Sequence, residues 1–267
     1  MAAPCPTLLQ VDAARMTATA LWLGAWLRGT AGSDDLLEAM AQAAPDSPAV
    51  GSVQGAGASP LPDLLRAIRV AGSDGTWVLL PRPGRILGWP DDVDGPPDPA
   101  VLISRGERPV GLLRHEADGW RWDRVDSAAV GQLRADMLTA RSGMRALAEV
   151  VTSAAERLER LGLERAPTRS APTGWESALR RLPHGLDPAG EALLVRLGAL
   201  HDALDLARVE EGAAVTAAEV QARAAEVHQV LGRVEDLIVG VVGGLNAPAG
   251  APVERGPRSA ASVERHT

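Results

Sequence analysis

The sequence predicts an α+β protein, in which a small mixed α/β module is followed by an antiparallel, coiled-coil-like bundle of three helices. Two observations lead to this prediction. Three C-terminal stretches carry apolar residues at alternating steps of three and four, which is typical of amphipathic helices. Before them, short apolar runs alternate with helical stretches and with turns rich in glycine and proline. We expect the module at 1–125, the bundle at 126–245 and a disordered tail at 246–267.

The longest C-terminal stretch runs from about 126 to 161 and is predicted to be a single helix. At 1.5 Å per residue it would be roughly 50 Å long. It cannot bury its apolar stripe alone, so we expect other helices to pack against it. The stripe consists of Val130, Leu133, Met137, Ala140, Met144, Leu147, Val151, Ala154, Leu158 and Leu161.

Two further long helices complete the predicted bundle. Asp187 caps the first of them and Pro188 opens it. Its apolar stripe consists of Leu193, Leu197, Leu200, Leu204 and Ala207. The stripe of the last helix consists of Val220, Ala224, Val227, Leu231, Val234, Ile238, Val241 and Leu245. The final turns are apolar on nearly all sides, so we expect that end to be buried on more than one side.

The N-terminal module is predicted from shorter signals. Helices are expected at 12–29, 33–44 and 60–70, and strands at 49–53, 77–80, 101–103, 110–113 and 120–122. The pair 101–103 and 110–113 should form a hairpin that turns at Gly106. The strands at 49–53 and 77–80, with the helix between them, suggest a small β-α-β unit.

Residues 12–29 also allow another interpretation, a signal peptide with Arg15 as its charged end. Arg28 directly follows the apolar run, and no small-x-small cleavage site is evident, so a helix of the module is the better interpretation. This segment and residues 238–245 are both too short to cross a bilayer. We expect a cytoplasmic protein without a membrane span.

The composition excludes several kinds of chemistry. The chain is 46% hydrophobic with a net charge of −7, which argues against binding nucleic acid by broad phosphate neutralisation. Because the chain has no lysine, it can form no Schiff base with pyridoxal phosphate and has no phosphate-loop lysine. Cys5 is the one cysteine, so an intrachain disulfide and a cysteine-rich metal site are excluded.

The segment 80–90, with the sequence LPRPGRILGWP, resembles a Leu-Pro-x-Pro-Gly-x-x-x-Gly-x-Pro loop of a family of uncharacterised actinobacterial proteins. Residues 211–219 and the helix after them are similar too, so the resemblance spans roughly 50–245. Arg85 stands where the resemblance leads us to expect an acidic residue. A polar role that depends on this acid would therefore not carry over to this loop. The resemblance implies a cytoplasmic protein from a high-GC organism and implies no function.

The same loop supplies the main candidates for a ligand contact. Guanidinium groups match the geometry of carboxylate and phosphate, and Arg82 and Arg85 lie in a loop rich in glycine and proline. With His115, we expect them on the wall of a cleft between the two modules, where an anion would bind. The alternative is a solvated turn that the prolines shape.

Metal binding is a further hypothesis. His201 and Asp205 are four apart on one predicted helix, and His228 with Glu226 or Asp236 could face them from the next. No Glu-x-x-His pair occurs, which argues against a di-iron bundle. Polar residues beside the leucine stripe are the simpler interpretation, so we predict no metal site.

Nucleotide binding has a weaker basis. Gly51, Gly55 and Gly57 lie between a predicted strand and a predicted helix, as in a dinucleotide fingerprint. Pro60 stands where the third residue of that pattern should be glycine or alanine. An ordinary loop is the simpler interpretation, so we predict no cofactor.

The sequence therefore favours a non-enzymatic interaction or scaffold protein that acts through its helical bundle, as a homodimer or with a protein partner at the C-terminal helices. The apolar end of the last helix motivates this expectation. The alternative is a small-molecule or anion-binding protein, or an enzyme, with a site at the junction of the two modules. An enzyme should have a convergent acid–base set, and no catalytic residues are recognised in the sequence.

Overall fold

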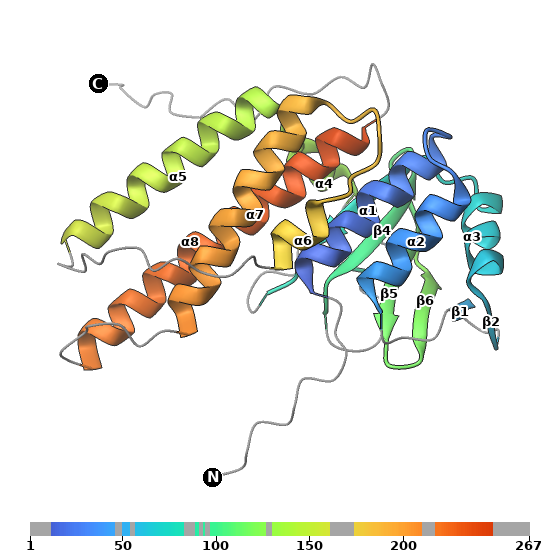
Figure 1. Ribbon diagram of the computed structural model, residues 1–267, viewed down its shortest axis with the longest axis horizontal. Helices are drawn as coiled ribbons and strands as arrows, with labels where there is room; N and C mark the ends of the chain where they lie inside the picture. The colour runs from blue at the N-terminus through green and yellow to red at the C-terminus, as the bar shows by residue number, and fades with distance from the viewer. Residues whose placement is uncertain are drawn as a thin grey trace, which may run out of the picture.

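The computed structural model describes residues 12–45, 50–53, 57–82, 89–90, 93, 97–126, 130–160, 174–209 and 217–247. It has an α+β architecture, with a six-stranded mixed sheet and helices packed around it. Figure 1 shows helices α1 and α2 in front of the sheet, and the long helices α5, α7 and α8 extending to one side of it. The helices of the N-terminal part are α1 (Ala13–Leu27), α2 (Ser33–Ala43) and α3 (Leu61–Val70).

The sheet has the strand order β2-β1-β6-β5-β4-β3. Only the pairing of β1 with β6 is parallel among these described strands. Neighbouring residues of a strand point to opposite faces, and in β3 and β4 both faces are buried. The strands are β1 (Val50–Val53), β2 (Ala58–Pro60), β3 (Gly75–Leu79), β4 (Ala100–Arg105), β5 (Arg108–Glu116) and β6 (Gly119–Arg124).

The predicted N-terminal helices and strands are confirmed, but the predicted β-α-β unit is wrong. Strands β1 and β3 do not pair, because the β4–β5–β6 meander lies between them in the sheet. The hairpin of β4 and β5 turns at Gly106, whose φ of 59° suits glycine, and the Gly106 amide donates to Asp74 Oδ1 at 2.8 Å. Strand β2 was not predicted, because the proline-rich stretch before α3 gives no strand signal.

The predicted single helix at 126–161 is wrong. The chain forms a short helix α4 (Val130–Ala135) and a separate helix α5 (Ala140–Arg160). Between them, the Leu138 amide donates to the carbonyl of Gly240 in α8 (Ala217–Asn246) at 2.9 Å. Thr139 then caps α5, because its Oγ1 accepts from the Ser142 amide at 3.2 Å. The apolar repeat of 126–161 is therefore divided by a hydrogen bond to a residue distant in sequence and by a local helix cap.

The buried face of α5 also differs from the predicted stripe. Leu147 and Ala154 are buried as expected, but Val150 is buried in place of Val151, which is 46% exposed. The side chain of Met144 is also exposed. A Cβ atom at neighbouring Gly143 would come within 2.6 Å of the Leu193 side chain, so this glycine faces the protein interior. Two residues of the predicted stripe are thus left at the surface.

Helices α5, α7 (Pro188–Val209) and α8 pack against one another, and the short helix α6 (Gly174–Leu179) packs against α7. Asp187 caps α7 as predicted, because its carboxylate accepts from the Gly190 amide at 3.1 Å. Helix α8 also packs against β3 and α1. Most of the described helices therefore share one hydrophobic core with one face of the sheet, and α4 packs with the other face in a second, smaller core.

The C-terminal end of α8 is fixed between α1 and β3 by the side chain of Asn246, which is buried. Its amide nitrogen donates to Thr76 Oγ1 at 2.8 Å and to the Ala20 carbonyl at 3.1 Å. The Arg28 guanidinium donates to the Asn246 carbonyl at 2.9 Å, and burial lowers the pKa of Arg28 from its usual value. Asn246, the first residue of the predicted tail, thus belongs to the helix, and residues 248–267 lie outside the described part.

We expect Gly240→Ala to destabilise the protein by about 1–3 kcal/mol, because a Cβ atom there would lie 2.7 Å from the Asp136 carbonyl oxygen. Gly131→Ala in α4 is the matched control, because a Cβ atom there meets nothing within 4 Å. It should be neutral or stabilising by up to about 1 kcal/mol. Urea denaturation of both variants measures the difference. Equal stability of the two variants would contradict the close approach of α8 to the α4–α5 link.

Candidate functional site

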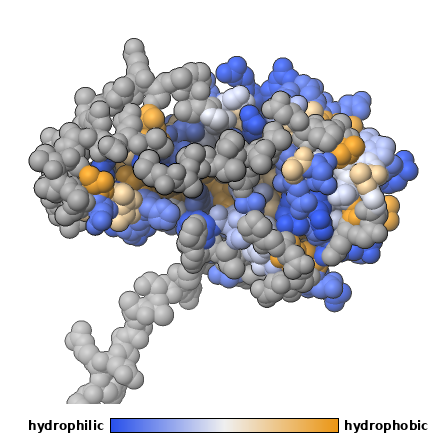
Figure 2. Space-filling model, turned by 90° about the horizontal axis from the view of Figure 1, so that it is seen from below, coloured by the Kyte–Doolittle hydropathy of each residue, from blue (hydrophilic) through white to orange (hydrophobic). Residues whose placement is uncertain are grey.

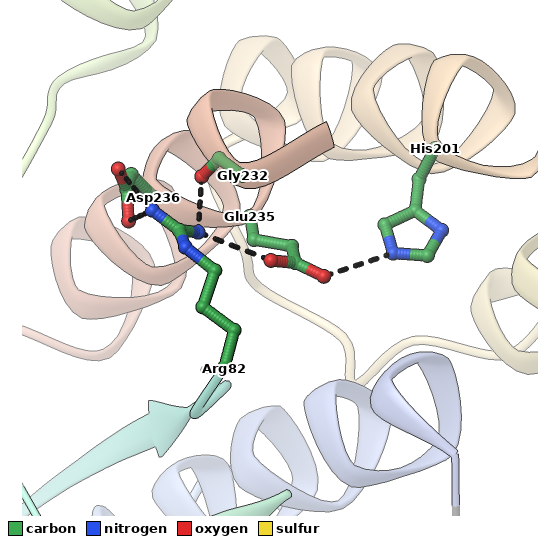
Figure 3. Close-up of polar contacts among 5 residues, drawn as sticks. All are labelled: Arg82, His201, Gly232, Glu235 and Asp236. Carbon is green, nitrogen blue, oxygen red and sulfur yellow. Dashed lines mark hydrogen bonds and ion pairs between the residues drawn. The ribbon is translucent and has the colours of Figure 1, made fainter. Parts of the chain in front are cut away.

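Arg82 leaves the end of β3 and reaches α8, where it contacts two carboxylates (Figure 3). Its guanidinium donates to Glu235 Oε2 at 3.0 Å and to both carboxylate oxygens of Asp236 at 3.0 and 3.1 Å. It also donates to the Gly232 carbonyl. All three charged side chains are less than one-third exposed. We call Arg82, Glu235, Asp236 and His201 the junction cluster.

The local sequence explains how this cluster forms. Strand β3 ends at Leu79, and Pro81 has no N–H group with which to continue its ladder. Positions 232, 235 and 236 are three and four apart and therefore lie on one face of α8. A Cβ atom at Gly232 would lie 2.8 Å from Arg82 Cζ, so glycine allows the guanidinium to reach the helix backbone.

His201 joins the junction cluster from α7, on the other side of Glu235 (Figure 3). Its Nε2 lies 3.5 Å from Glu235 Oε1. Its ring packs against Trp175 of α6, with ring centroids 5.3 Å apart. Glu235 therefore lies between a guanidinium from the sheet side and an imidazole from α7, which links three elements through one carboxylate.

Two of the three predicted ligand contacts are described, and the structure places these two on different parts of the fold. Arg85 lies outside the described residues. Arg82 contacts α8, whereas His115 lies on β5, which β4 separates from β3. At about 4.8 Å per strand, β3 and β5 are roughly 10 Å apart. The His115 ring packs edge-on against Trp120, with centroids 5.2 Å apart.

The contacts of Arg82 change what this part of the molecule can bind. The arginine is already paired with two carboxylates, so an anion would have to compete with Glu235 and Asp236 for it. Removing a charged group from such a pair leaves its partner without compensation, which is unfavourable. The junction therefore offers an anion little free positive charge at Arg82.

The residues considered for a metal site are distributed over separate ion pairs. Glu226 accepts from Arg157 Nε at 2.7 Å, and Asp205 pairs with Arg208 at 2.8 Å. Among the described residues, no group of three or more histidine, cysteine, aspartate or glutamate side chains is placed to hold a metal ion. His201 contacts Glu235 instead.

Gly51 has a packing role in the described structure. It lies within β1, and a Cβ atom there would come 2.8 Å from Leu64 of α3. The glycine thus lets α3 approach the sheet closely. Gly55 of the proposed fingerprint lies outside the described residues.

A second ionic network lies on β5 and β6 and involves Asp123, whose side chain is buried. Arg114 donates to Asp123 at 2.6 Å and Arg121 donates to it at 2.8 Å. The hydrogen bond to Asp123 raises the pKa of Arg121 above its usual value. Glu116 adds a second carboxylate near both arginines, so the charges balance and the network ties the two strands together.

A cavity of about 210 Å³ adjoins the junction cluster. It lies between β3, the α4–α5 link and α8, and Asp236 belongs both to its wall and to the cluster. Its lining consists of Val78, Leu79, Leu80, Asp136, Leu138, Asp236, Leu237 and Val239.

Sequence reasoning missed Glu235 as the centre of the junction cluster and Trp175 as the partner of His201. The adjacent acids at 235 and 236 were a signal, because they directly precede the apolar stretch 237–245 of α8. Their partner is distant in sequence, so only the folded arrangement identifies Arg82 as the residue between them.

Comparison with known proteins gave one family match. Residues 16–130 match the family model described as Rv1486c-like protein, N-terminal domain. The match runs from α1 to the first residue of α4, which is less than half of the chain. This part of the chain is therefore similar to that domain, and it overlaps the expected resemblance at 50–130. No curated protein and no solved structure matched.

In the described part of the chain, every helix is too short or too polar to cross a membrane.

We expect Arg82→Met to destabilise the protein by about 2–4 kcal/mol, because it leaves Glu235 and Asp236 partly buried without their cation. The control is Arg66→Met, which removes an exposed arginine 3.9 Å from Asp63. It should cost less than about 1 kcal/mol. Chemical denaturation at neutral pH compares the two. Equal effects would show that the junction cluster contributes no more than a surface ion pair.

Proposed function

We propose that this chain is a non-enzymatic interaction protein, and that two copies associate through the outer surface of α5 and α7. This proposal includes the antiparallel three-helix bundle expected from the sequence, with α5, α7 and α8 as its helices. The observation that carries it is a second apolar stripe on α5, directed away from the core. A cytoplasmic location stays a prediction that cell fractionation can test.

The α5 strip consists of exposed apolar residues at steps of four, three and four, which places them on one side of the helix. Met144 is 37% exposed and Val151 is 46% exposed. The core-facing residues Leu147, Val150 and Ala154 occupy another side. The members of the strip are Met144, Ala148, Val151 and Ala155.

A corresponding α7 strip lies on the neighbouring helix. Arg196 Nη1 lies 3.6 Å from Met144 Sδ, which places this side of α7 beside the α5 strip. Its larger members, Val195 and Leu206, are 45% and 38% exposed. A helix from a second copy laid against both strips would extend the bundle by the same kind of packing. The α7 strip consists of Ala192, Val195, Ala199, Ala203 and Leu206.

The apolar end of α8, which motivated self-association from the sequence, has another explanation. Val234, Ile238 and Val242 are fully buried within the chain, against the sheet and neighbouring helices. On the face seen in Figure 2, the visible described residues are mostly hydrophilic, with hydrophobic ones in separate groups. The regular strips on α5 and α7 therefore give the proposal its surface.

The spacing within α5 favours a second copy of this chain as the partner. In an antiparallel pair of α5 helices centred between Ala148 and Val151, each large residue lies opposite a small one. Met144 faces Ala155 of the second copy, and Val151 faces Ala148. A two-fold symmetric interface requires such self-complementarity.

The charges along α5 agree with the same arrangement. Arg141 and Arg145 lie near its N-terminal end, and Glu156 and Glu159 lie near its C-terminal end, all exposed. An antiparallel pair brings Arg141 near Glu159 of the second copy and Arg145 near Glu156. A parallel pair would bring like charges together, so charge complementarity favours the antiparallel orientation.

We expect the full chain to be dimeric in light scattering after size exclusion, and Met144→Glu with Val151→Glu to make it monomeric. Each glutamate would place a charge in the apolar centre of the interface, where it would be desolvated. The control is Val70→Glu on α3, which is 81% exposed and far from α5. This control should remain dimeric. A wild-type chain that stays monomeric at millimolar concentration would contradict the proposal.

Charge exchange tests the orientation. Arg141→Glu with Arg145→Glu should weaken association roughly tenfold or more, because four like charges would face one another. Adding Glu156→Arg and Glu159→Arg to the same chain should restore it. The measurement is the dissociation constant from sedimentation equilibrium. Failure of the fourfold variant to recover, when it is folded by circular dichroism, would contradict the antiparallel arrangement.

A further inference from the structure

We propose that the cavity between β3, the α4–α5 link and α8 binds a small organic cation, an amine with an apolar body. This site is separate from the proposed association surface, and it reverses the sign of the charge expected from Arg82 and Arg85 in the sequence. The reasons are the apolar wall of the cavity, the charges around it and its size.

The described part of the cavity wall is aliphatic apart from two carboxylates. Apolar side chains come from three segments: Val78 from β3, Leu138 from the α4–α5 link and Leu237 from α8. Small-molecule sites are mostly apolar, with a few polar groups that fix orientation. Among the described wall residues, the polar side chains are those of Asp136 and Asp236. A ligand that matches this wall has an apolar body and a positively charged end.

The balance of charge around the cavity favours a cation. Among the described residues, Asp136, Glu235 and Asp236 are the acids at or beside the cavity, and Arg82 contacts the last two. The Arg82 guanidinium is hydrogen-bonded to Glu235 and Asp236 on α8. Asp136 adds a further negative charge to the cavity wall. An ammonium group near Asp136 would offset the charge of that carboxylate, whereas a carboxylate there would add to the repulsion.

The adjoining backbone adds acceptors for the same group. Strand β3 is one of the two edge strands of the described sheet, so part of its peptide groups face away from β4. Its residues Val78 and Leu79, followed by Leu80, line the cavity. An ammonium group has three N–H donors and can use a carbonyl and a carboxylate together.

The volume sets the size of the ligand. An apolar cavity of roughly 150 Å³ accommodates a benzene ring. The cavity here is about 210 Å³, which leaves room for a ring of that size with one short aminomethyl arm. Benzylamine is therefore a suitable probe, with benzyl alcohol and benzoate as neutral and anionic probes of nearly the same shape.

The experiment measures binding of the three probes to the full chain by ligand-observed and protein-observed NMR titration at neutral pH. We expect benzylamine to bind roughly tenfold more tightly than benzyl alcohol, the size of one charge interaction in a partly exposed site. Benzoate should bind more weakly than both. Benzoate binding as tight as benzylamine, or no binding of benzylamine at millimolar concentration, would overturn the proposal.

Two variants locate the site. Asp136→Asn keeps the size of the side chain and removes one charge, so it should reduce the preference for benzylamine over benzyl alcohol roughly tenfold. Val239→Phe should fill the cavity and abolish binding of both probes. Asp118→Asn, in the turn before β6, is the matched control and should change nothing. Unchanged probe selectivity in Asp136→Asn would overturn the assignment even if Val239→Phe does not fold.

The chain with Met144→Glu and Val151→Glu should bind benzylamine as the wild type does, which separates this test from that of association.

Discussion

The placement of α8 between the sheet and the other helices is the constraint on which the rest of the structure depends. Its C-terminal half is apolar on nearly all sides and lies against β3, α1, α5 and α7. The buried side chain of Asn246 fixes the end of this helix, because it hydrogen-bonds to β3 and α1 at once. A buried amide that loses such partners is costly, so this contact also determines how far α8 enters the core.

Two features on which the proposals rest follow from this placement. The glycines of α8 allow the Asp136–Leu138 link to approach it closely, which separates α4 from α5 and leaves a cavity beside the link. The break also sets the rotation of α5, so that Val150 faces the core and Met144 with Val151 faces outward. The cavity and the α5 strip are thus consequences of one packing arrangement, although they would serve different partners.

The junction cluster shows that the role of a charged residue depends on its partners in the folded chain. In the sequence, Arg82 in a loop rich in glycine and proline is a free cation suited to an anion. In the structure, the same guanidinium is hydrogen-bonded to Glu235 and Asp236, and the group becomes part of the connection between β3 and α8. The proposed ligand therefore carries a positive charge, because Asp136 is a further acid at the wall of the adjoining cavity.

The sequence by itself determined the class of fold and most helices and strands, because local periodicity, caps and turns are properties of neighbouring residues. Asp187 as a cap and Gly106 as a turn are examples in which the local signal was sufficient. Thr139 was an available signal for the start of α5, but the uninterrupted apolar repeat outweighed it. Only the tertiary structure decided the strand order, the outward face of α5 and the partners of Arg82. Each of these depends on contacts between segments far apart in the chain, whose pairing no local pattern encodes.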